Sequence, residues 1–193
     1  MGQNQLRIAG WCIVISLIVG GFNSFAFAAD KKEQERQEIR KMAQQTLSSL
    51  YKAQPSAKTA LENAKGYAVF SNFGMKIFLA GGGSGSGIAV NRATKQETFM
   101  KMAEVQAGLG MGVKKFRIVF VFETEQVLSN FVNQGWEFGG QATAAAKAEG
   151  KGRGLAGAIS VSPGIWMYQL TETGLAAEIT AKGTKYYKDS GLN

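Results

Sequence analysis

The chain has 193 residues, a single cysteine, no histidine and a net charge of +8. These totals exclude a disulfide within the chain, an imidazole metal site and a Ser-His catalytic triad, so we expect no metal, no cofactor and no enzymatic activity. The basic balance favours an anionic partner such as phospholipid, polysaccharide or nucleic acid.

Residues 1–28 have the pattern of a signal peptide. Arg7 precedes an apolar segment at 8–19, and "AFA" at 26–28 forms a small-x-small cleavage site. The alternative is an uncleaved anchor, but the apolar segment is shorter than the roughly 20 residues that a spanning helix needs. We therefore predict cleavage near Ala28/Ala29 and a periplasmic or secreted location, which makes nucleic acid the least expected partner. Cleavage removes Cys12 and lowers the net charge to +7, since Arg7 is lost and no acid.

Residues 30–50 contain no glycine or proline and predict an amphipathic helix. Its apolar positions recur at steps of three and four: Ile39, Met42, Ala43, Leu47 and Leu50. The opposite face is basic and carries Lys32, Arg36, Arg40 and Lys41. This face is the first candidate for contact with an anionic surface.

A second helix is predicted to begin after Pro55 with Ser56 as its N-cap and to stop at Gly66. Its expected buried positions are Ala57, Ala60, Leu61 and Ala64.

Beyond Gly66 the sequence changes to short apolar or alternating segments separated by glycines, which predict strands. Only "TEQVLSNFVNQG" at 124–135 has helical spacing, and Gly135 should end it. Many short strands favour an antiparallel, strongly curved or closed sheet. The expected fold class is α+β, with N-terminal helices packed on a barrel-like antiparallel sheet and one inserted helix. We expect a single domain over 29–193, divided into the helix at 29–54 and a core at 55–187.

The segment "GGGSGSG" at 81–87 presents glycines at every second position. No Lys-Ser or Lys-Thr pair follows it, as a phosphate-binding loop would require. In a strand, Gly83, Gly85 and Gly87 share one face, and Gly108, Gly110 and Gly112 repeat the pattern. Two interpretations remain open at this point: a helix packed on the glycine stripe, or a bound apolar chain lying over it.

The acidic residues give little support for catalysis. Glu123 and Glu125 flank Thr124 at a transition from strand to helix, where carboxylates favour the helix dipole. A hydrolase would need two acids facing one cleft, for example Glu104 and Glu123.

Two more basic clusters follow, the first at Lys114, Lys115 and Arg117 and the second around Lys151 and Arg153. Each cluster alone is typical of a solvated surface. Convergence of the clusters in space would instead indicate an anionic membrane, because each cation near such a surface contributes about 1 kcal/mol.

The aromatic residues fall into two groups. Alternation with polar residues makes Trp136, Phe138, Trp166 and Tyr168 core candidates, whereas Tyr186 and Tyr187 occupy a polar segment and are candidates for contact at a membrane interface.

Five motifs, in this order, resemble the SYLF domain, a lipid-binding module of eukaryotic actin-patch and endosomal proteins that also occurs in exported bacterial proteins. They are "AKGYAVF" (64–70), "GGGSGSGIAVNR" (81–92), "IVFVFETEQVLSNF" (118–131), "WEFGGQATAAA" (136–146) and "TETGLAAEITAKG" (171–183). The resemblance implies binding of anionic phospholipid, such as phosphoinositide or phosphatidic acid, partly through a basic N-terminal helix. Some eukaryotic members also bind actin, which an exported protein would not meet.

We therefore expect non-catalytic binding of anionic lipid head groups at a membrane surface. The expected lipid-binding residues are Lys32, Arg36, Arg40, Lys41, Lys114, Lys115, Arg117, Lys151 and Arg153. The alternative is a structural or protein-interaction component of the cell envelope.

Overall fold

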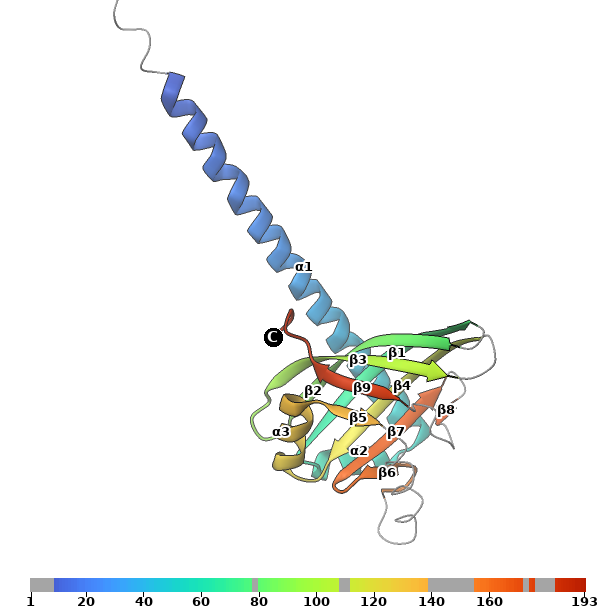
Figure 1. The fold of residues 1–193 in the computed structure, drawn as a ribbon. Coiled ribbons are helices and arrows are strands. Elements are labelled where there is room, and N and C mark those ends of the chain that lie inside the picture. The colour runs from blue at the N-terminus through green and yellow to red at the C-terminus, as the bar shows by residue number, and fades with distance from the viewer. Residues whose placement is uncertain (1–8, 78–79, 108–111, 139–154, 172–173, 176–182) are drawn as a thin grey trace, which may run out of the picture. The chain divides into compact units, whose positions relative to one another are not determined.

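The computed structural model describes the backbone of residues 9–77, 80–107, 112–138, 155–171, 174–175 and 183–193 (Figure 1). Side chains are described for residues 29–72, 83–104, 116–138 and the later ranges. The chain divides into two compact units, residues 1–38 and 39–193, and each is considered by itself. Among the described helices, none combines the length and apolarity needed to cross a bilayer.

Helix α1 (Ala9–Ala53) is continuous and belongs to both units. Helix α2 (Ser56–Asn63) follows after two residues, and here the predicted N-cap is wrong. Pro55 already has helical backbone angles and occupies the cap position, so Ser56 is the first helical residue. The helix ends before Gly66 because Ala64 is extended and leads into the sheet. Ala57 and Leu61 are buried as expected, whereas Ala60 and Ala64 are only half-buried.

Helix α3 (Glu125–Gln134) confirms the predicted inserted helix. The Thr124 side chain accepts a hydrogen bond from the Val127 backbone N–H at 3.2 Å, which satisfies one of the free amides of the first turn. Gly135 ends the helix with a φ of 74°, a conformation that glycine adopts at little cost.

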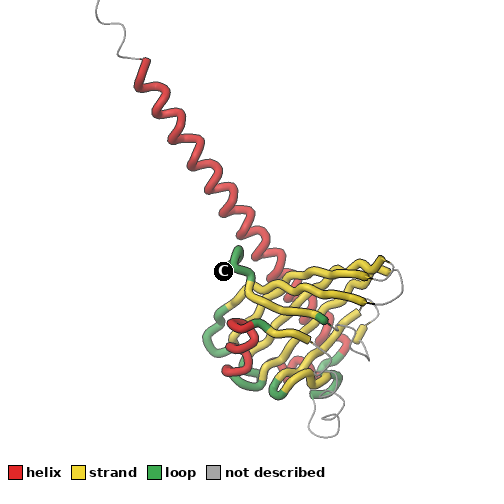
Figure 2. The backbone as a smooth tube through the Cα atoms, in the orientation of Figure 1, coloured by secondary structure: helices red, strands yellow, loops and turns green. Residues whose placement is uncertain are grey.

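The strands form one antiparallel sheet (Figure 2). In chain order they are β1 (Gly66–Ile77), β2 (Ala80–Asn91), β3 (Glu97–Ala107), β4 (Gly112–Phe122), β5 (Trp136–Phe138), β6 (Ile159–Ser162), β7 (Ile165–Thr171), β8 (Gly174–Leu175) and β9 (Thr184–Lys188). Among the described residues, the order across the sheet is β5-β9-β3-β2-β1-β4-β7-β6, with β8 paired to β7.

The sheet curves into a nearly closed barrel. Phe120 on β4 and Tyr186 on β9 are separated by three intervening strands, yet their ring centroids lie 5.0 Å apart. Trp136 on β5 lies 5.5 Å from the same Phe120 ring. Rings on strands so distant in the sheet order meet only if the sheet curves round on itself, and the predicted α+β fold with a barrel-like sheet is confirmed.

Alternation along the strands separates two hydrophobic layers. The inner face of the sheet carries Phe70, Phe120 and Tyr186, and α3 adds Leu128 and Phe131. The outer face carries Val69, Ile88, Val119 and Tyr168, and residues 39–53 of α1 together with α2 cover it through Ile39, Ala43, Leu50 and Leu61. A different helix therefore packs on each face.

Candidate functional site

The glycine stripe of β2 belongs to the inner face of the barrel. A Cβ added at Gly85 would collide with the Ser71 carbonyl oxygen and lie 2.8 Å from Met102 Cγ. A Cβ at Gly87 would collide with the Phe70 ring and the Val69 carbonyl oxygen. Side chains of the neighbouring strands thus fill the space above the glycines, and the expectation of a helix on this stripe is wrong.

Of the second glycine run, Gly108, Gly110 and Gly112, only Gly112 belongs to the described residues. Gly108 and Gly110 lie outside the described residues. Gly112 is the first residue of β4, and its backbone pairs with Lys76 of β1.

Gly83 makes room for a polar contact inside the barrel. Asn72 of β1 donates a hydrogen bond from Nδ2 to Glu104 Oε2 of β3 at 2.5 Å, across the intervening β2. A Cβ at Gly83 would lie 2.9 Å from Asn72 Oδ1 and 3.2 Å from Glu104 Oε2. Burial raises the pKa of Tyr186, which belongs to the same face, and the Glu104 carboxylate raises it further.

The two acids considered for a hydrolase do not share a cleft. Glu104 of β3 is the register partner of Gly83 on β2. Glu123 follows Phe122 of β4, and the row of Phe122 across the sheet reaches β2 at Asn91, the opposite end of that strand. The eight-residue interval along β2 corresponds to about 26 Å. Glu123 instead accepts a hydrogen bond from Trp166 Nε1 at 2.7 Å.

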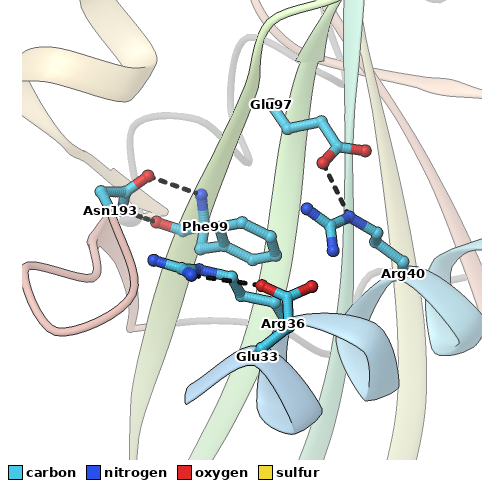
Figure 3. A network of polar contacts seen from close by, with 6 residues as sticks. All are labelled: Glu33, Arg36, Arg40, Glu97, Phe99 and Asn193. Carbon is cyan, nitrogen blue, oxygen red and sulfur yellow. Dashed lines mark hydrogen bonds and ion pairs between the residues drawn. The ribbon is translucent and has the colours of Figure 1, made fainter. Parts of the chain in front are cut away.

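The predicted helix cations differ in their surroundings. In the first unit Lys32 is exposed, and Arg36 forms an ion pair with Glu33 at 3.3 Å. In the second unit Lys41 is exposed, whereas Arg40 is held against the sheet. Arg40 Nε lies 2.8 Å from Glu97 Oε2, and the guanidinium is 5.2 Å from the centroid of the Phe99 ring (Figure 3).

The backbone of Phe99 is also held by the last residue of the chain. Asn193 Nδ2 donates to the Phe99 carbonyl at 2.8 Å, and Asn193 Oδ1 accepts from the Phe99 amide at 3.0 Å (Figure 3). Arg40 and the C-terminal segment therefore fix the same point of β3.

The remaining predicted cations belong to the strands and loops. Lys114 and Lys115 are residues of β4 whose backbones pair with Gly74 and Phe73. Arg117 is half-buried on the outer face, next to Ser71. Lys151 and Arg153 lie outside the described residues.

The outer face has a second half that differs from the apolar half beneath α1 and α2. We call it the outer strip: Ser71, Ser84, Ser86, Lys101, Ala103, Arg117, Lys185 and Tyr187. One row across the sheet runs from Tyr187 through Lys101, Ser86 and Ser71 to Arg117. All its members are exposed or half-buried.

The outer strip combines cations, hydroxyl groups and one aromatic ring. Lys101 forms an ion pair with the buried Asp189 at 3.0 Å but keeps 47% of its side chain exposed. Arg117 and Lys185 form no ion pair with the described residues, and Lys185 lies opposite Glu137 of β5. Among the described residues, Tyr187 is the one large hydrophobic side chain that is exposed, with 38% of its surface accessible.

Sequence reasoning singled out Tyr187 and Arg117 in this strip but missed Lys101 and Lys185. Their positions follow from strand alternation once the pairing of β3 with β9 is known. That pairing joins segments about 80 residues apart, and no local pattern predicts it.

Three further tyrosines have a perturbed pKa, and the acidic residues were compared with the arrangement that a metal ion needs. Burial raises the pKa of Tyr51, Tyr67 and Tyr168. Within the described ranges, no group of three or more Cys, Asp or Glu residues is arranged to hold a metal ion.

Comparison with known proteins gives two matches. Residues 103–193 match the family model described as "Ysc84: Las17-binding protein actin regulator". "Beta cell expansion factor A" of Aeromonas veronii is 34% identical over 154 residues, which cover 80% of this chain and 57% of that protein. The chain thus spans little more than half the length of this relative.

Proposed function

We propose, from the premise that this chain belongs to the SYLF (Ysc84) family, that it binds anionic phospholipid at a membrane surface and catalyses no reaction. The proposal includes export through the signal peptide at 1–28 and action in the periplasm or outside the cell. The observation that carries it is the outer strip, whose exposed or half-buried side chains combine cations and hydroxyl groups with the exposed Tyr187 at one end.

The composition of the strip matches the chemistry of a phospholipid head group. Serine hydroxyls and the guanidinium of Arg117 donate hydrogen bonds to phosphate oxygens, and lysine supplies a mobile positive charge. Ser71 and Ser86 face each other across β1 and β2, so only short side chains separate Lys101 from Arg117. Tyr187 has an apolar ring with a polar tip, which suits the depth of the head groups.

The N-terminal helix contributes differently from the initial expectation. Ile39, Ala43 and Leu50 are buried against the sheet, so the apolar face of residues 39–53 serves the fold. In this segment only the polar face, with Lys41, is exposed to a membrane. Lys32 and Arg36 belong to the other unit and remain proposed lipid-binding residues by themselves, as do Lys114, Lys115, Lys151 and Arg153.

Liposome co-sedimentation tests the proposal. Wild-type protein should pellet with vesicles of phosphatidylcholine plus phosphatidylglycerol and stay in solution with phosphatidylcholine alone. Binding should weaken with added salt because charges farther apart than about 8 Å are screened at physiological ionic strength. The R117Q/K185Q variant removes two unpaired cations of the strip, so binding should fall roughly 30-fold at about 1 kcal/mol per cation.

The matched control is K58Q/K65Q, which removes the same charge from exposed positions outside the strip. It should bind close to wild type. Equal losses in both variants would show that only net charge matters and would reject the strip. Equal pelleting with neutral and anionic vesicles would reject the lipid-binding function itself.

A second candidate is a protein-interaction role in the cell envelope. It is favoured by the family description, which names binding to the protein Las17 and regulation of actin. Affinity capture from envelope extract with the full chain would support it if one protein were retained in fixed proportion and no lipid were found. Loss of that capture in R117Q/K185Q would assign the interaction to the outer strip.

A further inference from the structure

A small pocket lies between α3 and the inner face of the sheet, the face opposite to the outer strip. Its volume is about 180 Å³, which corresponds to roughly six water molecules. The lining comes from β2, the loop before β3, β3 itself, α3 and the end of β9. Such a volume is smaller than the usual range for drug-sized ligands and suits a small metabolite.

Three apolar residues contribute to the pocket lining. Ala89 and Leu128 are almost fully buried, and Val132 adds a half-buried side chain. Because α3 and β2 hold these residues in the inner hydrophobic layer, the apolar surface is a fixed part of the fold.

Two opposite charges line the same pocket. Glu125 belongs to the first turn of α3, and Lys188 is the last residue of β9. They form no ion pair with each other or with another described residue. A carboxylate and an ammonium group in one pocket, neither of them paired, leave both charges available to a ligand.

The other polar lining groups are partly engaged. Asn91 Oδ1 accepts hydrogen bonds from the amides of Ala93 and Thr94, and Asn133 donates to Ser129. The side chains of Gln96 and Thr98 form no hydrogen bond within the described chain, and Thr98 is 8% exposed. These two groups add neutral donors and acceptors to the pocket lining.

We propose that this pocket binds a small zwitterion with a short apolar body, of the type of a free aliphatic amino acid. The ligand's ammonium group pairs with Glu125, its carboxylate pairs with Lys188, and its aliphatic part contacts Ala89 and Leu128. This site is independent of the outer strip and of lipid binding.

Chemical-shift titration of the full-length chain with L-valine, N-acetyl-L-valine and L-valinamide tests the proposal. Only L-valine carries both charges, so it should bind about tenfold more tightly than either analogue, since a hydrogen bond to a charged group typically contributes this much. The shifts should centre on the pocket lining. No saturable shift there with L-valine at millimolar concentrations would overturn the proposal.

Variants assign the two charges. E125Q should weaken L-valine binding about tenfold and leave the affinity for N-acetyl-L-valine, which has no ammonium group, unchanged. K188Q should likewise weaken L-valine binding about tenfold and leave the affinity for L-valinamide, which has no carboxylate, unchanged. K188R keeps the charge and should bind like wild type. K58Q and E62Q, at exposed positions of α2, are the controls for general charge loss. Equal L-valine affinity of E125Q, K188Q and wild type would also overturn the proposal.

Discussion

Substitution of Gly87 by alanine tests the role of the glycine stripe most directly. The new Cβ would overlap the Phe70 ring and the Val69 carbonyl oxygen. The carbonyl belongs to the sheet backbone and is fixed by strand pairing. The ring is held by Tyr186 at 4.8 Å and Phe120 at 6.0 Å between centroids, so neither neighbour is free to move away.

The expected cost combines opposing effects. Overpacking of a well-filled core costs about 1–3 kcal/mol, and a displaced aromatic pair loses about 0.5–1.5 kcal/mol. Alanine also lowers the conformational entropy of the unfolded chain relative to glycine, and this offsets about 0.4–1 kcal/mol of the loss in stability. The midpoints of these ranges sum to a loss of about 2 kcal/mol in the free energy of unfolding of G87A, which corresponds to a fall in Tm of roughly 4–8 °C for a domain of this size.

Urea unfolding followed by tryptophan fluorescence measures this change. S86A is the matched control because Ser86 is the neighbouring residue on the outer face, and its loss should change stability by no more than about 0.5 kcal/mol. G87A/F70L should recover part of the loss, since leucine vacates the space of the ring. A G87A protein as stable as wild type would refute the explanation of the stripe by close approach of core side chains.

Three further changes probe the helix contacts and the interior. L50A removes a fully buried side chain between α1 and the sheet, so chemical denaturation should show a loss of about 2–5 kcal/mol; a loss below about 1 kcal/mol would contradict the docked helix. In a double-mutant cycle, R40A and E97A should show a coupling of at most about 1 kcal/mol, because both side chains remain about one-third exposed; a larger value would indicate a stronger pair than the geometry allows. The raised pKa of Tyr186 keeps its hydroxyl protonated in the folded state while the unfolded state ionises near pH 10, so stability should fall as pH rises above about 10. Y186F should reduce this alkaline loss, and an unchanged pH profile would argue against burial of the hydroxyl.

The sequence by itself determined the element types and much of their order. Helical spacing in 30–50 and 124–135 depends on neighbours three and four residues apart, and alternation beyond Gly66 depends on neighbours two apart. Such local patterns predicted the helices, the antiparallel sheet and the Gly135 stop. The ordered motifs also indicated the SYLF family, which the comparison with known proteins confirms.

Only the tertiary structure decided what each face contacts. Alternation placed Gly83, Gly85 and Gly87 on one side, but whether a helix, a ligand or neighbouring side chains cover them depends on strand order and curvature. In the same way, the pairing of β3 with β9 brings Lys101 and Lys185 together, and the docking of α1 turns Arg40 from a free cation into a partner of Glu97. These contacts join residues distant in the chain, so their energies are absent from any local window of the sequence.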